Sequence, residues 1–373
     1  MRLEPVQPRG GLLAVHAHPD DETLATGALL ATWAAAGEPV TLVTCTRGEQ
    51  GEVIGAELAH LEGDGPALAA HREGELAAAL ASLGVSDHVF LDQVEDGGPG
   101  RSPGQVGERS FRDSGMAWAA PGIARAAAEA DLPEGALVGV PLDEAARRLA
   151  RVLRERRPRV VVTYEPSGGY GHPDHVRAHE ITVRAIELAR EQGSALPDGG
   201  APDPEVVRLG GARAGDPSAG HEPALWQSVV PAEVARAARR ELAVLPGVAA
   251  LRAEHPELTL PDPEEPLPPV AKNGLEEVVV VEVEPVLGAV VGALRAHVTQ
   301  VQHVGVAVRH GDGAPAGERG QSAAGEVLGW YALSNDVLAA LPSREFYTVT
   351  SESAGASRTF TGNDQTGPVA WTS

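Results

Sequence analysis

Cysteine, aromatic residues and positive charge are all scarce in this sequence. Cys45 is the single cysteine, so no disulfide can form within the chain, which is typical of a reducing compartment. Aromatic residues make up 3% of the 373 residues, too few for the stacking surfaces on which single-stranded nucleic acids lie. The 30 lysines and arginines face 52 aspartates and glutamates, and the net charge of −22 repels phosphate backbones and anionic membranes. We therefore expect no nucleic-acid partner and no membrane partner.

Long hydrophobic runs are also missing. No run is long enough to cross a bilayer, and the apolar run from Gly11 to Val15 is too short for a signal peptide. These absences predict a cytoplasmic protein whose partner is a neutral small molecule or a metal cation. The sequence leaves the oligomeric state open.

Hydrophobic residues nevertheless amount to 43%, enough for a globular core. Val-rich runs alternate with longer segments rich in Ala, Leu and Arg, which predicts an α/β fold. We expect a mostly parallel, Rossmann-like sheet flanked by helices, with loop insertions and a smaller C-terminal part. The expected strands are residues 12–17, 40–44, 88–91, 159–164 and 277–283, and the expected helices are residues 22–35, 69–82, 144–156, 174–190 and 286–302.

Three segments interrupt this pattern. Residues 193–223, 256–274 and 311–325 lack regular periodicity and are expected to be surface insertions. The strongest motifs lie upstream of them, so we expect one α/β unit. In this interpretation residues 1–190 form a metal-binding catalytic core, and residues 191–373 continue the same domain with the insertions and with C-terminal elements on the substrate side.

A polar cluster stands where the first strand is expected to end and the first helix to begin. Residues 16–22 read His-Ala-His-Pro-Asp-Asp-Glu, two imidazoles and three carboxylates within seven residues. Such a concentration of polar groups beside a core strand is costly, although Asp20 or Asp21 alone could simply cap the helix. Ligands bind at this edge of open α/β sheets, so the cluster predicts a functional site.

A second cluster, Tyr-Gly-His-Pro-Asp-His at residues 170–175, follows the expected strand at 159–164 and precedes a helix. Two loops at the carboxyl edge of one sheet can meet, although 154 residues separate Asp21 from His175. Three glycines within residues 168–171 permit the tight path that this loop needs. A lone loop histidine is usually only solvated, but His-Pro-Asp repeated at two such positions indicates one shared site.

The residue types in the two clusters suit a metal. Catalytic zinc takes three imidazole, thiolate or carboxylate ligands and keeps a fourth position open. We assign His18, Asp21 and His175 to the metal. Asp20, which is not needed as a ligand, is then free to accept a proton from water.

Hydrolysis of an amide also needs an acid, because an amine leaves poorly unless it is protonated. His172 is the candidate, with Asp174 able to hold its imidazole and to favour the charged form. Tyr170 can donate a hydrogen bond to the carbonyl oxygen. Each assignment has a structural alternative: Tyr170 could only pack, and Asp174 could only cap the following helix.

Motifs of other protein classes are missing. No G-x-G-x-x-G follows the first expected strand, and the sequence contains neither a P-loop nor a G-x-S-x-G elbow. These absences disfavour a nucleotide-binding module and a serine hydrolase. A two-metal phosphatase would need more ligands and more positive charge.

At these residues the sequence resembles the LmbE-like, or GlcNAc-phosphatidylinositol de-N-acetylase, superfamily. Its pattern is His-Pro-Asp-Asp-Glu near the N-terminus and a later His-Pro-Asp-His. Within the superfamily the sequence is most similar to the GlcNAc-inositol deacetylases of mycothiol biosynthesis. The likeness lies in residues 44–55, 111–116, 163–166, 293–297 and 332–334, and so spans nearly the whole chain.

The resemblance implies a deacetylase that hydrolyses the N-acetyl amide of an N-acetylglucosaminyl-inositol, with one zinc ion per chain or ferrous iron in its place. It implies the roles given above for both clusters and adds Arg72, Glu52 and Asp113 as substrate-binding residues. Two alternatives stay open. One is a mycothiol S-conjugate amidase, which shares the catalytic residues, and the other is a non-enzymatic sugar- or nucleotide-binding module.

Overall fold

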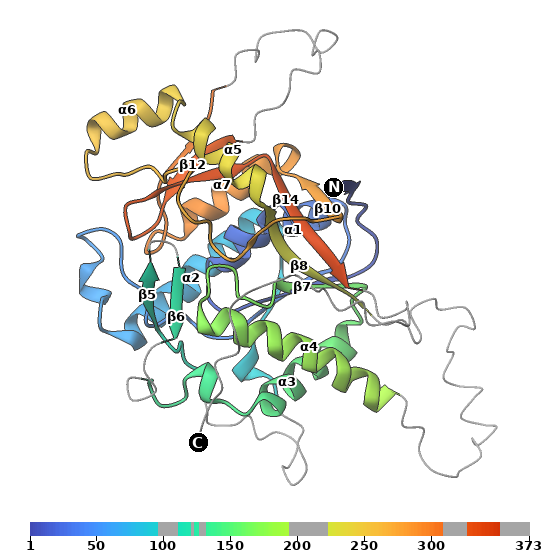
Figure 1. Ribbon diagram of the computed structural model, residues 1–373. Helices are drawn as coiled ribbons and strands as arrows, with labels where there is room; N and C mark the ends of the chain where they lie inside the picture. The colour runs from blue at the N-terminus through green and yellow to red at the C-terminus, as the bar shows by residue number, and fades with distance from the viewer. Residues whose placement is uncertain (96–110, 121–122, 127–131, 194–222, 309–326, 351–373) are drawn as a thin grey trace, which may run out of the picture.

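In this computed structural model the chain is described at residues 1–95, 111–120, 123–126, 132–193, 223–308 and 327–350. A nine-stranded sheet lies at the centre (Figure 1), in the order β1-β10-β14-β8-β7-β2-β3-β4 with β9 paired to β8. Only β14 runs antiparallel to its neighbours within this sheet. Its strands are β1 (Arg2–Pro5), β2 (Leu12–His16), β3 (Val40–Thr44), β4 (Asp87–Phe90), β7 (Val160–Tyr164), β8 (Ala224–Pro231), β9 (Ala271–Lys272), β10 (Glu277–Glu282) and β14 (Arg344–Thr350).

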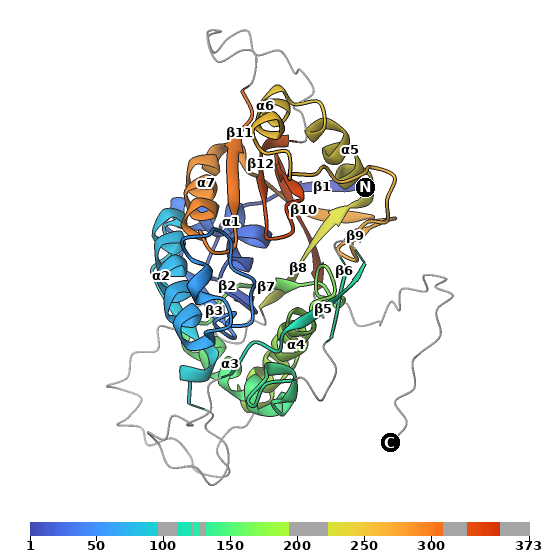
Figure 2. The ribbon, with the colours of Figure 1, turned by 90° about the vertical axis from the view of Figure 1, so that its left-hand side faces the viewer.

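Helices cover both faces of the sheet, as Figures 1 and 2 show. Alternate residues of β2 point to opposite faces: Leu12 and Ala14 pack with α1, α2 and α7, whereas Leu13 and Val15 pack with α3 and α4. Two hydrophobic cores therefore share the strands between them, as parallel sheets require. The α-helices are α1 (Asp21–Ala35), α2 (Gly65–Leu83), α3 (Leu142–Arg156), α4 (Pro173–Gly193), α5 (Ala232–Leu242), α6 (Pro246–Glu254) and α7 (Leu287–Ala296), and the 3₁₀ helices are η1 (Ala59–Leu61), η2 (Leu91–Gln93), η4 (Leu137–Gly139) and η5 (Glu284–Val286).

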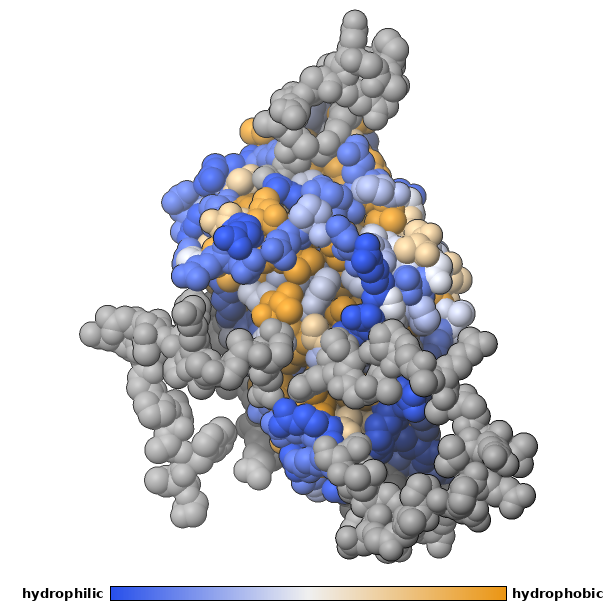
Figure 3. Space-filling view, turned by 90° about the vertical axis from the view of Figure 1, so that its right-hand side faces the viewer, coloured by the Kyte–Doolittle hydropathy of each residue, from blue (hydrophilic) through white to orange (hydrophobic). Residues whose placement is uncertain are grey.

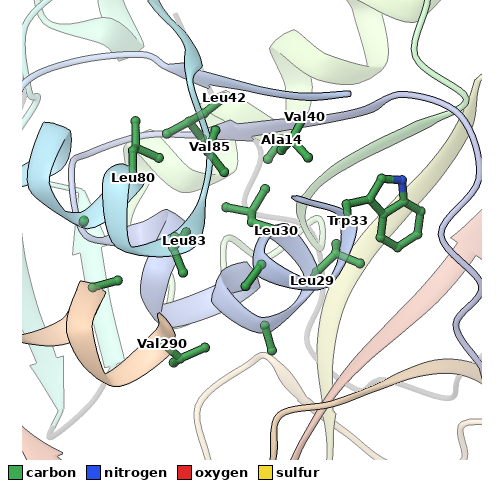
Figure 4. Close-up of a cluster of buried hydrophobic side chains, with 14 of the residues drawn as sticks. Ala14, Leu29, Leu30, Trp33, Val40, Leu42, Leu80, Leu83, Val85 and Val290 are labelled. Carbon is green, nitrogen blue, oxygen red and sulfur yellow. The ribbon is translucent and has the colours of Figure 1, made fainter. Parts of the chain in front are cut away.

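The core on the α1 side rests mainly on aliphatic side chains, with Trp33 as its largest buried aromatic residue (Figure 4). Leu29 and Leu30 of α1 are fully buried, and Trp33 is 1% exposed. The indole Nε1 of Trp33 donates to the carbonyl of Gly10 at 3.0 Å, so this aromatic ring is buried without leaving its polar atom unpaired. This packing fixes α1, and with it the loop that precedes the helix.

Two smaller sheets complete the fold. β5 (Met116–Ala120) and β6 (Ile123–Ala126) form a hairpin, and β11 (Gln302–Val306), β12 (Val327–Ala332) and β13 (Leu338–Pro342) form an antiparallel sheet. The three-stranded sheet packs with α5 and α6 around its own small core, which contains Leu242, Val248 and Leu258. This antiparallel unit is the smaller C-terminal part expected from the sequence.

The mostly parallel α/β fold is confirmed, and each strand expected within residues 12–164 lies within one residue of its predicted ends. One helix was predicted too long: α7 ends at Ala296, and β11 already begins at Gln302. The backbone turns away at Thr299, whose N–H and hydroxyl both donate to the carboxylate of Glu75 at 2.8 and 2.7 Å. The segment 256–274 contains β9, whereas the expected insertions at 193–223 and 311–325 lie almost entirely outside the described residues.

The described surface offers no membrane-spanning element. None of the helices seen in these residues combines the length and the apolar character that crossing a bilayer needs. On the face in Figure 3, polar and hydrophobic side chains are interspersed among the described residues.

Candidate metal centre and catalytic site

The two His-Pro-Asp loops meet because the strands that precede them are neighbours. β2 pairs in parallel with β7, β3 lies on the far side of β2, and β8 lies on the far side of β7. The chain thus leaves β2 in one direction and β7 in the other, so the strand order reverses between these two strands. Open α/β sheets bind their ligands in this position.

Donor atoms of the three expected metal ligands lie within contact distance of one another. Nδ1 of His18 is 3.2 Å from Oδ2 of Asp21, and Nε2 of His175 is 3.2 Å from Oδ1 of Asp21. The two imidazole nitrogens are 3.3 Å apart, and all three side chains are buried. Ligand atoms in a tetrahedral zinc site with bonds of about 2.0–2.1 Å are roughly 3.3 Å apart. The donor set therefore fits such an ion in both chemistry and spacing.

Another trio, His18, His172 and His175, also places ligand atoms within 4.8 Å of one another. His172 is the weaker third ligand, because its Nδ1 already accepts the backbone N–H of Asp174 at 3.1 Å. Asp21, in contrast, contacts both of the other ligands at 3.2 Å. We therefore keep Asp21 in the proposed ligand set.

Carboxylates also surround the outer nitrogen of His18. Its Nε2 lies 3.3 Å from Oδ2 of Asp174 and 3.6 Å from Oδ1 of Asp113. Burial alone would lower the pKa of His18, but Asp113, Asp174 and Asp21 raise it well above the ordinary value. The pocket thus attracts a cation, and a carboxylate behind a ligating histidine fixes the orientation of the ring.

The position of Asp174 differs from the expectation that its carboxylate holds His172. That carboxylate accepts hydrogen bonds from the backbone N–H and the hydroxyl of Ser114, at 2.8 and 2.5 Å, and contacts His18. Only the backbone N–H of Asp174 contacts His172. The physical reason is that α4 begins at Pro173, and N–H groups in the first turn of a helix have no partner within it.

His172 accordingly has the geometry of a neutral imidazole. Because Nδ1 accepts a hydrogen bond, it carries no proton, and the ring proton is on Nε2. Burial, followed by the nearby His18 and His175, lowers the pKa of His172 well below its ordinary value. The expectation of a charged resting His172 is not supported by these contacts.

Comparison with known proteins places this site in a family. Residues 13–186 match the PIG-L family, described as GlcNAc-PI de-N-acetylase. A relative from Streptomyces avermitilis is 39% identical over 352 residues, which cover 93% of this chain and 94% of that one. The chain belongs to the PIG-L family.

This relative and a second one share the name 1D-myo-inositol 2-acetamido-2-deoxy-α-D-glucopyranoside deacetylase. The second is the protein of Kineococcus radiotolerans, 46% identical over 295 residues that cover 79% of this chain and 70% of that one. Among solved structures, N,N'-diacetylchitobiose deacetylase from Pyrococcus horikoshii matches with 22% identity and a TM-score of 0.33, covering 48% of this chain and 50% of that one.

In this PIG-L family member, Asp20 has an unusual backbone. Its φ is 104°, a region that non-glycine residues rarely adopt, and strain of this kind concentrates at functional sites. The N–H of Asp20 donates to Oε2 of Glu22 at 2.9 Å, and Nη2 of Arg72 lies 3.4 Å from its carboxylate. Burial raises the pKa of Asp20 to about 7, although Arg72 acts in the opposite direction. A carboxyl group with a pKa near neutrality suits a general base.

A buried ion pair that the sequence analysis did not predict supports this backbone. Nε2 of His297 lies 2.8 Å from Oε1 of Glu22, and both side chains are fully buried. Burial opposes both charges, but their mutual attraction outweighs it, so the pKa of Glu22 is lowered and that of His297 is raised. Both residues lie in segments noted in the sequence, but nothing in the sequence pairs positions 275 residues apart.

Tyr164 lies in a segment that resembles the superfamily, but no role was expected for it from the sequence. Its ring stacks on His175, with centroids 4.2 Å apart, and its hydroxyl accepts the backbone N–H of Ala17 at 2.9 Å. Tyr164, the last residue of β7, thus contacts both loops that carry the proposed metal ligands. Because Tyr164 ends an apolar strand, its sequence position indicates only a role in packing.

Tyr170, the expected hydrogen-bond donor, lies beside the proposed ligands. Its ring is 5.1 Å from that of His175, and burial raises the pKa of its hydroxyl above the usual range, so the phenol keeps its proton. The loop is held by the backbone N–H of Ala124, which donates to the carbonyl of Tyr170 at 2.8 Å. Gly171, at φ 94°, is required here, because a Cβ atom would lie 2.8 Å from the carbonyl oxygen of Ala124.

The three expected substrate-binding residues occupy different places. Asp113 is buried beside His18. Arg72 is 2% exposed, and its guanidinium donates to the carbonyls of Gly48 and Pro19, so it positions the loops around Asp20. Glu52 lines a cavity of about 350 Å³, together with Val53, Ile54, Gly55, Glu62, Gln302, Ser334 and Asp336.

Proposed function

We propose that this protein hydrolyses the N-acetyl amide of an N-acetylglucosaminyl-inositol, and that His18, Asp21 and His175 hold the required divalent metal. One observation carries the proposal: Nδ1 of His18 and Nε2 of His175 lie 3.3 Å apart, and each lies 3.2 Å from a different carboxylate oxygen of Asp21. A separate carboxylate, that of Asp20, directly precedes Asp21 in the chain. The names of the relatives from Kineococcus radiotolerans and Streptomyces avermitilis support the substrate.

The chain's own residues supply the proton chemistry in this proposal. When bound, the metal would supply positive charge that polarises the amide carbonyl and makes water more acidic. Asp20 accepts the proton of the attacking water, and the C–N bond then breaks as the amine nitrogen takes a proton from Asp20. The products are the free amine and acetic acid, which ionises in water. Tyr170 and the Nε2–H of neutral His172 donate hydrogen bonds to the oxygen on which negative charge develops.

Substrate contacts form a further part of the proposal. Glu52 faces the 350 Å³ cavity, which also contains the acidic side chains of Glu62 and Asp336. Hydrogen-bond acceptors of this kind suit the hydroxyl groups of a sugar or an inositol ring. Asp113 contacts His18, so we propose that it acts on the metal-binding side of the substrate. Arg72 lies beside the carboxylate of Asp20, so we propose that it acts through Asp20.

We propose zinc as the metal, since two imidazoles and one carboxylate match its preferred ligands, with ferrous iron as the alternative. The proposed partner is a small-molecule amino-sugar glycoside in the cytoplasm. Neither assignment depends on the other, because the donor set supports the metal, whereas the names of the relatives support the substrate.

The test is to incubate the zinc-loaded protein with GlcNAc-inositol and, separately, with a mycothiol S-conjugate, and to quantify free amine. We expect the first substrate to be hydrolysed faster. Asp20→Asn serves as the control, because it keeps the ligands and removes the base. Faster cleavage of the conjugate would assign the protein as an amidase, and no hydrolysis of either substrate would overturn the proposal.

A further inference from the structure

A second group of potential ligands lies in the C-terminal part of the chain. His255 follows the last residue of α6, Glu257 is two residues further on, and His303 is in β11. One ligand atom from each of these side chains lies within 4.8 Å of the other two. None of the three belongs to the catalytic clusters. Two imidazoles and one carboxylate are the ligand types that divalent zinc and its neighbours prefer.

The backbone around His303 is shaped to bring its ring to this place. His303 has a φ of 54°, in the left-handed region, and the pairing of β11 with β12 is irregular between Gln302 and Gly305. Irregularities of this kind re-aim side chains and persist where the surrounding structure demands them. Here Gln302 donates to Asp336 at 2.9 Å, while the ring of His303 lies 4.3 Å from that of His255.

The other two side chains are also held in place. Leu258 is fully buried, and its carbonyl accepts Nε of Arg252 in α6 at 3.1 Å, so the turn that carries His255 and Glu257 is anchored on both sides. Nδ1 of His255 lies 3.2 Å from Oε1 of Glu257. The three side chains therefore need little rearrangement to bind a metal ion.

Negative charge also lies beside the two imidazole rings. Glu257 is the carboxylate that belongs to the same group of ligand atoms as both histidines. Asp336 lies on the Gln302 side of β11. Carboxylates in these places favour a bound cation.

We propose that His255, Glu257 and His303 form a second site for a divalent cation of the zinc class, which joins the end of α6 to β11. The side chains of His255 and Glu257 are 39% and 52% exposed, so water completes the coordination and the affinity is lower than at the buried catalytic ligands. The ion would stabilise the wall of the 350 Å³ cavity that Gln302 lines. The proposal does not rest on the deacetylase function.

The experiment removes the first site so that the second can be measured alone. The full chain carrying His18→Ala and His175→Ala is titrated with Zn²⁺ by calorimetry, and with Co²⁺ by visible absorption. We expect one ion per chain. Adding His303→Asn should weaken binding at least about tenfold, since asparagine tolerates a positive φ and the loss then reports the missing imidazole. His60→Asn is the matched control, because His60 is exposed and lies outside the cluster.

A second measurement keeps the proposal testable if the double variant does not fold. In the otherwise unchanged chain, zinc added beyond the first equivalent should raise the unfolding temperature, and His255→Gln or His303→Asn should abolish that rise. Absence of a second zinc equivalent, or a second equivalent that binds unchanged in both histidine variants, would overturn the proposal. Loss of this site with full deacetylase activity would leave the proposed function intact.

Discussion

The loop after β2 and the loop after β7 share the sequence His-Pro-Asp, but their aspartates do different things. The carboxylate of Asp20 lies beside Arg72 and contacts neither proposed imidazole ligand among the described contacts. The carboxylate of Asp174 lies against His18 and Ser114. One loop thus presents a group that is available for chemistry, and the other presents a group that orients a ligand.

The difference follows from where each helix begins. α1 begins at Asp21, so Asp20 precedes it and adopts a non-helical φ of 104°. α4 begins at Pro173, so Asp174 is already within the first helical turn. The same three residues are therefore placed in different registers relative to the helix start, and their side chains point to different neighbours. Likeness of motif does not imply likeness of role.

The largest expected effect comes from removing a ligand contributed by either loop. His18→Ala and His175→Ala should each lose the catalytic metal, leaving only an ion at the proposed second site, and should lower activity by at least about 10³-fold, because two ligands cannot hold the catalytic ion. A chelator should do the same to the unaltered protein, and zinc should restore it. Metal content is measured alongside turnover. Full activity in metal-free protein would contradict this prediction.

The next largest effect separates the two aspartates. Asp20→Asn should lower kcat by on the order of 10² or more while the metal stays bound, since a positioned base is removed and no ligand is lost. Metal content and kcat are determined on the same preparation. If this variant loses its metal as readily as His18→Ala does, then Asp20 is a ligand and the assignment of the two carboxylates in the first loop is wrong.

Asp174→Asn should show the opposite pattern. Because its carboxylate supports the outer nitrogen of His18, we expect metal affinity to fall by about 10–100-fold, with much of the activity recovered at high zinc concentration. Competition with a chromophoric chelator gives the affinity. A variant with unchanged affinity but low activity would instead return Asp174 to the role expected from sequence, as the partner of His172.

The smallest expected effect is on stability, and it concerns α1, the helix that follows the first loop. Glu345 of β14 accepts the N–H groups of Ala28 and Leu29 in α1, at 2.7 and 2.9 Å, and burial raises its pKa to about 7. The folded state then binds a proton that the unfolded state, with an ordinary pKa, releases. Stability should therefore fall as pH rises from about 4.5 to about 7, by at most about 3 kcal/mol relative to Glu345→Gln.

Urea unfolding at about pH 5 and about pH 8 checks this prediction. The matched control is Glu282→Gln, a change at an exposed glutamate of the neighbouring strand β10. The free energy of unfolding could differ between Glu345→Gln and the unaltered protein by the same amount at both pH values. That result would show that Glu345 is ionised throughout, and that the link between α1 and β14 does not depend on protonation.

Much of the sheet and the location of the site could be predicted from local patterns. The run Val40–Thr44 consists of β-branched residues and one leucine, which suit a buried strand, and its predicted bounds match the structure. The helices and strands in the later half of the chain were harder to predict. β8 and α5 were not predicted, because their half-buried residues lack a continuous apolar run. β11 was not predicted either, and the helix expected to end at residue 302 overlapped its first residue.

The sequence by itself determined that two His-Pro-Asp clusters follow parallel strands, since residue order and hydrophobic pattern are local properties. It also indicated His18, Asp21 and His175 as metal ligands, an assignment that stays a proposal. Only the tertiary structure decided that Asp174 contacts His18, that Glu22 pairs with His297, and that His303 lies beside His255. Each of these contacts depends on the direction of a side chain and on chain segments far apart in sequence, which are set by packing and not by the neighbouring residues.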